Sequence, residues 1–142
     1  MDVSSLPFNR HLGLSLDPSG DPAAVVLQPS AIHLNHVATV HATVLYGVAE
    51  AASGQCLLMR FPSLADSSLA VLRSSSVKYR RPAAPDCRID ARGTLPDEAA
   101  ARFFTALTSR GRASVEIDVS VTQDDMELFR GTFVWFVTGK ES

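Results

Sequence analysis

The stretch SVEIDVSVT, residues 114–122, alternates apolar and polar side chains without interruption, and it constrains the fold more than any other segment. Val115, Ile117, Val119 and Val121 share one face of an extended strand, and polar residues occupy the other face. Such a strand buries one face on a core and leaves the other in water, which is typical of antiparallel sheets. The pattern therefore predicts a half-buried strand that needs a second layer.

Other short apolar or alternating segments, bounded by turn residues, predict further strands. These strands span residues 12–16, 23–28, 69–80, 88–95 and 127–138, and the third is long enough to be bent. Residues 17–22 predict a turn between the first two strands, and residues 123–126 predict a hairpin turn before the last. Residues 96–110 predict a short surface helix, with Phe103, Phe104 and Leu107 on one side.

Apolar residues recur near the 3.6-residue period from His41 to Met59, which predicts one long, buried helix. The segment RFPS, residues 60–63, ends this helix because the residue before a proline avoids helical geometry. The order of elements predicts an α+β domain in which one curved sheet wraps a central helix. Six strands leave two exposed edges, so we expect a dimer with a continuous sheet.

Composition excludes several classes of function. The 142 residues suffice for one domain whose core needs no disulfide or metal. The formal net charge is -2, whereas a nucleic-acid binder normally carries a basic excess. The sequence shows no membrane-spanning stretch and no signal-peptide pattern, and Cys56 and Cys87 are expected to be free thiols. We expect a cytoplasmic protein that binds neither nucleic acid nor membrane.

Thr43, Gly47, Glu50 and Gly54 are spaced four, three and four residues apart, so they share one face of the predicted helix. A glycine inside a helix costs about 1 kcal/mol relative to alanine, so Gly47 indicates close approach of another backbone or a ligand. On this narrow face the Glu50 carboxylate would lose water, its pKa would rise, and it would suit a general base. The alternative is that Glu50 is solvated or paired with an arginine.

Other candidate features are weaker. The helix start offers free backbone N–H groups around residues 42–45 that could hold a developing oxyanion. His33, His36 and His41 match no metal-ligand spacing, so we expect loop or capping roles and no metal. Nucleophile and phosphate-loop motifs are missing from the sequence. The basic segment KYRRP, residues 78–82, is either a solvated strand end or a binding site for a phosphorylated ligand.

The segment NHVATVHATVLYGVAEAASG, residues 35–54, resembles the hotdog-fold acyl-CoA thioesterases, a group that includes 4-hydroxybenzoyl-CoA and phenylacetate-pathway thioesterases. Their motif reads roughly N-x-x-G-x-x-H-G-G followed by an Asp or Glu, and Asn35, His41 and Glu50 fall on its Asn, His and acid. Residues 95–121 look like a less characterised thioesterase-like branch, in which a short helix precedes a long alternating strand.

The resemblance implies a single hotdog thioesterase-like domain over residues 1–142 that hydrolyses an acyl-CoA or a related acyl thioester. In that family the acid, here Glu50, is the nucleophile or the base for water, and the backbone amide at Thr43 polarises the thioester carbonyl. Asn35 and His41 would help to shape the pocket. Because the acid and the amide often come from different subunits, the resemblance implies a site at the interface of a homodimer, alone or within a dimer of dimers.

Basic residues after the third strand often bind the coenzyme A phosphates in this family. The resemblance therefore implies substrate contacts from Ala42, Gly47, Lys78, Tyr79, Arg80 and Arg81. Coenzyme A is then part of the substrate, and no separate cofactor is expected.

The chain departs from the family motif where Ala38, Ala42 and Thr43 stand at glycine positions. These departures leave two alternatives open. One is a non-catalytic acyl-CoA-binding or scaffold protein in which side chains close the oxyanion site. The other is a hydratase or dehydratase acting on enoyl or hydroxyacyl thioesters, which would use a His and acid pair such as His41 and Glu50.

Overall fold

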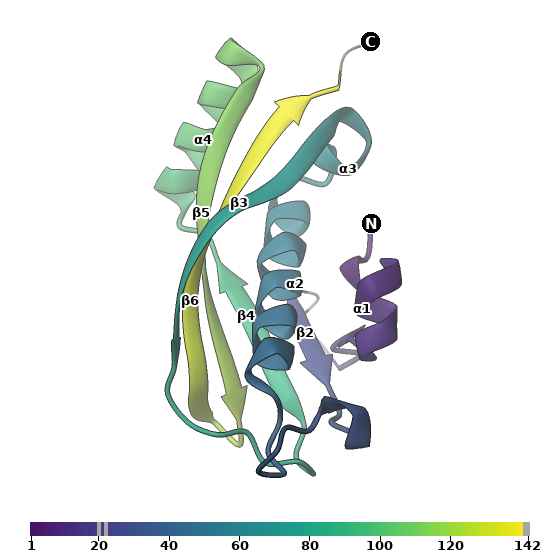
Figure 1. Ribbon diagram of the computed structural model, residues 1–142. Coiled ribbons are helices and arrows are strands. Elements are labelled where there is room, and N and C mark those ends of the chain that lie inside the picture. The colour runs from purple at the N-terminus through teal and green to yellow at the C-terminus, as the bar shows by residue number, and fades with distance from the viewer. Residues whose placement is uncertain (20, 22, 141–142) are drawn as a thin grey trace.

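The computed structural model describes residues 1–19, 21 and 23–140, and it shows one antiparallel sheet around a long helix (Figure 1). The strands are β1 (Ser15–Leu16), β2 (Ala24–Leu27), β3 (Ser68–Tyr79), β4 (Ile89–Thr94), β5 (Arg112–Gln123) and β6 (Met126–Gly139). The helices are α1 (Pro7–Leu12), α2 (Ala42–Arg60), α3 (Leu64–Ser67) and α4 (Asp97–Arg110), with 3-10 turns η1 (Val3–Ser5) and η2 (Ala31–His33). The sheet order is β1-β2-β4-β5-β6-β3. The predicted α+β hotdog architecture is therefore confirmed.

The alternating segment forms β5 as predicted, and its apolar side chains lie in the core. Val115, Ile117, Val119 and Val121 are each at most 4% exposed. The hairpin to β6 turns at residues 124 and 125, where two aspartates both have positive φ angles, of 50° and 62°. A two-residue turn with positive φ at both positions matches the twist of the paired strands.

The contact between α2 and β4 holds the helix against the sheet. A Cβ added to Gly93 would lie 2.6 Å from the Cys56 Cβ and 3.1 Å from the Ala52 carbonyl oxygen. The glycine is therefore needed because the helix backbone lies directly on the strand. The same side of α2 buries Val48 and Ala49 completely.

The N-terminal region differs from the prediction. Residues 12–16 were expected to form a strand, but α1 ends at Leu12 and only Ser15–Leu16 pairs with β2. Gly13, with a φ of 82°, ends α1 in the left-handed conformation. A helix of six residues is too short to show a period in the sequence. In Figure 1, α1 lies on the side of α2 away from β4.

Two other predictions are only partly tested or partly wrong. The predicted turn at residues 17–22 includes residues 20 and 22, which lie outside the described residues, but the Asp17 N–H donates to the Ala24 carbonyl across it. On α4, Phe103 is buried, whereas Phe104 is 56% exposed and stacks on Phe61.

Both cysteines are free thiols. Over the described ranges, no helix is long and apolar enough to cross a membrane.

Strand β3 is a long, open edge of the sheet. It pairs with β6 on one side, and its register shifts between Leu72 and Ser74, which gives the predicted bend. Both faces are largely uncovered, and Leu69, Val71 and Tyr79 are at least half exposed. An uncovered edge with exposed apolar side chains is a surface that another strand can pair with.

We predict that Gly93→Ala destabilises the protein by about 1–3 kcal/mol, because the added methyl group overlaps Cys56 and forces α2 away from β4. Urea unfolding of the variant and the wild type measures this difference. Gly139→Ala is the matched control, since its Cβ would have only one contact, at 3.9 Å. Equal stability of the two variants would show that α2 is not held at Gly93.

Candidate functional site

The first turn of α2 is capped by a histidine. The Nδ1 atom of His41 accepts a hydrogen bond of 3.0 Å from the Thr43 N–H, and the His41 carbonyl accepts from the Val44 N–H. The predicted capping role is confirmed. The Thr43 amide is thus already occupied, whereas the Ala42 amide donates no hydrogen bond to any described residue.

The loop before α2 is organised by Asn35. Its Oδ1 accepts from the Val37 and Thr39 amides at 3.0 and 3.1 Å, and its Nδ2 donates to the Thr39 hydroxyl at 2.9 Å. Inside this loop Ala38 has a φ of 58°, in the region that favours glycine, and it stands at a glycine position of the motif that the sequence resembles. Asn35 therefore shapes the approach to α2.

The other histidines in this segment do not form a metal site. His33 is buried, accepts from the Ser30 amide at Nδ1 and donates from Nε2 to the Leu12 carbonyl at 2.7 Å. It therefore ties the end of α1 to the loop before α2, and His36 is exposed. No group of three or more His, Cys, Asp or Glu side chains in the described part of the chain could hold a metal ion.

A groove of about 300 Å³ brings together five of the predicted site residues. It is lined by Asn35, Ala42, Tyr79, Arg80 and Arg81, together with neighbouring residues of the loop and α2. These residues come from two segments about forty positions apart in the sequence. The two segments lie side by side where the end of β3 passes the start of α2. The loop, the helix start and the basic segment thus form one surface.

The basic residues at this groove are not equivalent. The Arg80 guanidinium forms an ion pair of 3.2 Å with Glu127, which also pairs with Arg130. Arg81 makes no ion pair with any residue that the structure describes, so its charge is available to a ligand. Lys78 lies opposite Arg130 in the β3–β6 pairing and does not line the groove.

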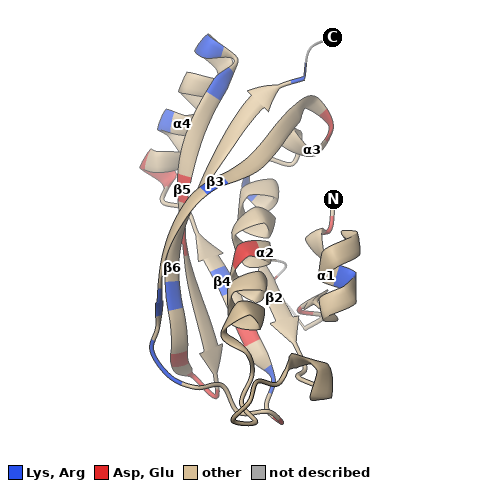
Figure 2. Ribbon diagram, in the orientation of Figure 1, with Lys and Arg blue, Asp and Glu red and all other residues tan. Residues whose placement is uncertain are grey.

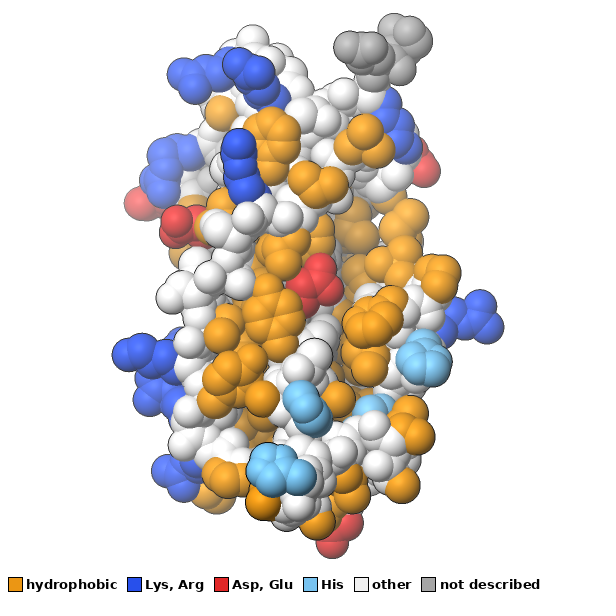
Figure 3. Space-filling view, viewed as in Figure 1, with side chains coloured by type: hydrophobic (Ala, Val, Ile, Leu, Met, Phe, Trp, Pro, Cys, Tyr) orange, Lys and Arg blue, Asp and Glu red, His pale blue; other side chains and the backbone are white. Residues whose placement is uncertain are grey.

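Glu50 lies midway along α2 and is half-buried. Burial raises the pKa of its carboxyl group. Within the described residues its carboxylate has no ion pair or hydrogen bond, so the alternative of an arginine partner is not what the structure shows. Figure 2 shows this one acidic position on α2, and Figure 3 shows hydrophobic side chains on both sides of an acidic patch in the same view.

The two helix glycines flanking Glu50 are approached by side chains. A Cβ on Gly47 would lie 2.9 Å from Cδ1 of Leu12 in α1, and a Cβ on Gly54 would lie 3.4 Å from the Trp135 ring. Gly47 does not line the groove, so its predicted substrate contact stays a prediction. We call this face of α2, with Thr43, Gly47, Glu50 and Gly54, the Glu50 seam.

Sequence reasoning missed a polar connection beneath the Glu50 seam. The buried Ser53 hydroxyl donates to the Glu50 carbonyl at 2.6 Å and accepts a hydrogen bond of 2.9 Å from the Trp135 indole N–H. Trp135 lies 82 positions further along the chain, so no local pattern could have shown this contact. The bond anchors Trp135 of β6 beside α2.

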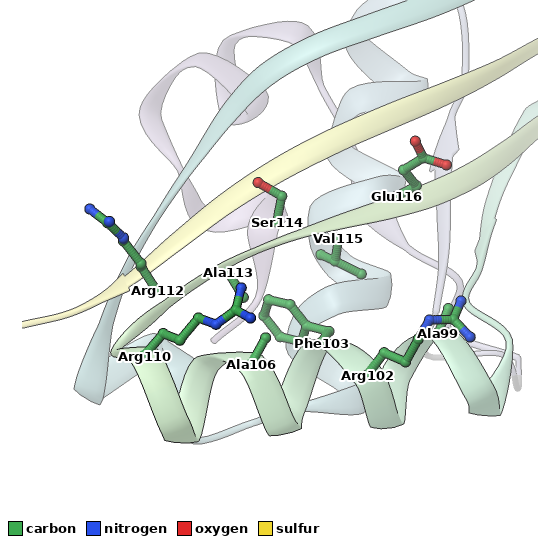
Figure 4. Close-up of a pocket in the computed structure, with 10 residues that line it drawn as sticks. All are labelled: Ala99, Arg102, Phe103, Ala106, Arg110, Arg112, Ala113, Ser114, Val115 and Glu116. Atoms are coloured by element: carbon green, nitrogen blue, oxygen red, sulfur yellow. The ribbon is translucent and has the colours of Figure 1, made fainter.

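A further cavity, of about 430 Å³, lies between α4 and the first half of β5 (Figure 4). In this region β5 is not paired with β4, because the pairing between the two strands starts at Asp118 of β5. Figure 4 shows Phe103 between Arg110 at one end and Arg102 at the other. This cavity contains none of the predicted site residues and is separate from the Glu50 seam.

The whole fold is similar to that of solved bacterial proteins. A Pseudomonas aeruginosa protein described as a probable thioesterase is 23% identical, with a TM-score of 0.74 over 97% of this chain and 91% of its own. A variant of the phenylacetic acid degradation protein PaaI from Thermus thermophilus is 23% identical, with a TM-score of 0.67 over 92% and 97%. A hypothetical thioesterase from Streptococcus pneumoniae, solved with coenzyme A, is 21% identical, with a TM-score of 0.61 over 84% and 80%.

At these identities the likeness establishes the fold. Comparison with curated protein sequences found no match. Residues 14–137 match the family described as Domain of unknown function (DUF4442), which covers most of the chain and all of the groove and the Glu50 seam. The chain therefore belongs to the DUF4442 family.

Proposed function

We propose that this protein hydrolyses acyl thioesters, with Glu50 as the base for water or as the nucleophile. The observation that carries the proposal is the half-buried Glu50 carboxylate, whose pKa is raised and which has no partner among the described residues. A carboxylate that burial makes more basic suits proton abstraction near neutral pH. Structural acids are normally paired or well solvated, and Glu50 is neither.

The second element of the site is the start of α2. The Ala42 amide is free within the described residues, and the Thr43 amide becomes free if the His41 ring turns away. Backbone amides at a helix N-terminus point outward and can polarise a carbonyl oxygen. The proposed oxyanion site consists of these amides beside the groove that Asn35 shapes.

The two elements require a second copy of the chain. Thr43 and Glu50 are seven residues apart on one helix, which is about 10 Å, so they do not reach one carbonyl together. Pairing of the open β3 edge with the β3 edge of a partner would extend the sheet and bring two α2 helices to one interface. We therefore infer a homodimer, alone or within a dimer of dimers, in which Glu50 of one protomer serves the α2 amides of its partner.

The groove beside α2 suits the phosphates of coenzyme A. Arg81 has no ion pair with a described residue, and Tyr79 lines the same groove. Arginine binds phosphate through paired N–H donors, and a neutralised Arg80 leaves Arg81 as the main contact. The bound coenzyme A in the Streptococcus pneumoniae structure supports this ligand class for the fold.

One observation favours a second candidate function, which is binding of acyl-CoA without hydrolysis. The His41 ring occupies the Thr43 amide, so one oxyanion donor is blocked in this structure. A thiol-release assay beside a binding assay with coenzyme A thioesters separates the two functions. Release of thiol supports the hydrolase, and binding without release supports the second candidate.

We predict that Glu50→Gln lowers kcat/KM for acyl-CoA hydrolysis about 10²- to 10⁴-fold, because the amide does not accept a proton from water. Thiol release measures the rate, and circular dichroism checks the fold. Glu116→Gln, on the exposed face of β5, is the control and keeps the wild-type rate. An unchanged rate in Glu50→Gln would show that Glu50 is neither the base nor the nucleophile.

We predict that kcat/KM rises with pH to a plateau, with a midpoint above the ordinary glutamate value of 4.5. The base acts only when deprotonated, and burial raises the pH at which it loses its proton. A pH–rate profile of thiol release shows the midpoint. A midpoint at or below 4.5 would contradict a desolvated base.

We predict that two lysines on the open edge, in the double variant Val71→Lys and Ser74→Lys, convert the dimer to monomers and abolish hydrolysis together. Charged side chains on an edge strand oppose its pairing with another edge. Analytical ultracentrifugation and thiol release measure the two effects. Met126→Lys, at the β5–β6 turn, is the control and keeps both properties. A monomer with full activity would rule out the shared site.

A further inference from the structure

The cavity between α4 and β5 is lined by three arginines (Figure 4). Arg102 and Arg110 lie on α4, and Arg112 is the first residue of β5. None of the three forms an ion pair with a residue that the structure describes. Figure 2 shows basic positions at this end of the molecule, opposite the start of α2, so they are separate from the groove that contains Arg81. The cavity therefore carries a positive charge that no described carboxylate neutralises.

Two acids lie close enough along the chain to neutralise this charge, and neither does. Glu98 precedes Arg102 by four residues, which is the spacing of a helix ion pair, but the two side chains are not paired. Glu116 lies on β5, and Figure 4 shows its carboxylate on the side of the strand away from α4. A cation is ordinary in the last turn of a helix, which accounts for Arg110 but not for Arg102 in the middle of α4. Both arginines are thus available to an anionic ligand.

The two α4 arginines stand on either side of a small, apolar floor. They are eight residues apart, about 12 Å along the helix axis, and Ala106 lies between them on the same helix face. Figure 4 shows the Arg102 and Arg110 side chains rising from α4 toward β5. The apolar wall behind them includes Phe103 and Val115, which are 3% and 4% exposed. Because Ala106 is small, both guanidinium groups can turn inward over it toward one anion.

The edge of β5 adds a backbone donor to the cavity. The Gly139 N–H of β6 donates to the Gly111 carbonyl at 3.0 Å. Because alternate residues of an antiparallel strand bond to the same neighbour, Ser114 directs its backbone N–H away from β6. On that side β4 pairs with β5 only from Asp118 onward, and no other described residue accepts a hydrogen bond from the Ser114 N–H. The Ser114 N–H therefore faces the cavity without a partner among the described residues.

We propose that this cavity binds a small phosphate monoester with a compact apolar body. Two arginine side chains and one backbone N–H supply more donors than the two oxygens of a carboxylate accept, whereas the three terminal oxygens of a phosphate monoester accept them all. The buried ring of Phe103 and the neighbouring Val115 give the body an apolar surface. A volume of about 430 Å³ lies within the range for small-molecule pockets, about 300–1,000 Å³. The ligand is a second one, distinct from the proposed thioester, because the cavity is separate from the Glu50 seam.

The first test measures the binding of phenyl phosphate by isothermal titration calorimetry. We expect phenyl phosphate to bind the wild type at least tenfold more tightly than benzoate, which has the same ring and a carboxylate. Arg102→Gln and Arg110→Gln each weaken binding of phenyl phosphate at least tenfold, because each removes a charged set of donors. Arg10→Gln removes an unpaired, exposed arginine from α1, so it is the matched control and keeps the wild-type affinity. Absence of binding, equal affinity for benzoate, or equal loss in all three variants would overturn the proposal.

The second test locates the ligand and separates it from coenzyme A, which also carries a phosphate monoester. In ¹H–¹⁵N NMR spectra, phenyl phosphate is expected to shift the Ser114 amide signal and to leave the Thr43 amide signal unchanged. Arg81→Gln is expected to weaken the binding of coenzyme A and to leave the binding of phenyl phosphate unchanged. If Arg81→Gln weakens phenyl phosphate binding and Arg110→Gln does not, the phosphate binds in the groove beside α2 and the proposal is wrong.

A third variant tests the apolar floor without changing a charge. Ala106 is half-buried, and a leucine at this position would fill the space between the two arginines. Ala106→Leu is expected to weaken phenyl phosphate binding at least tenfold, whereas inorganic phosphate, which has no apolar body, still binds. Circular dichroism checks that the variant folds. A folded Ala106→Leu protein that binds phenyl phosphate with the wild-type affinity would contradict the proposal.

Discussion

The direct contact of α2 with β4 at Gly93 is the constraint on which the site depends. Because Cys56 and Ala52 rest on a strand residue without a side chain, one face of the helix is committed to the sheet. The opposite face of α2 is covered by two side chains. Leu12 of α1 lies over Gly47, and Trp135 of β6 lies beside Gly54. Glu50 lies between Gly47 and Gly54 on this face. It is half-buried, and its carboxylate has no ion pair or hydrogen bond with a described residue.

This arrangement is unfavourable for a structural acid and favourable for a reactive one. Desolvation of an unpaired carboxylate costs stability, and it raises the pKa of the same group. The chain has salt bridges available elsewhere, for example between Glu127 and both Arg80 and Arg130. The placement of Glu50 on an apolar face without an ionic partner is therefore the observation on which the proposed role toward a substrate rests.

Periodicity predicted the elements that carry long, regular patterns. β5 and α2 lie where the alternation and the 3.6-residue repeat placed them, and the seam containing Glu50 follows from the same spacing. The sequence did not predict α1, because this helix has only six residues. The contact of Leu12 with Gly47 was therefore not predicted either. The pairing of Arg80 with Glu127 depends on side-chain conformation and on a distant partner, which no local pattern contains. The predicted capping role of His41 was available from its place at the helix start.

The central claim is that Glu50 is a desolvated, unpaired carboxylate in the folded protein. A ¹³C NMR titration of the glutamate side-chain carboxyl carbons, with Glu50→Gln to assign the signal, measures its pKa directly. The account predicts a midpoint above 4.5, because burial disfavours the charged form. A midpoint at or below 4.5 would show that Glu50 is solvated or paired in solution, and it would contradict the account.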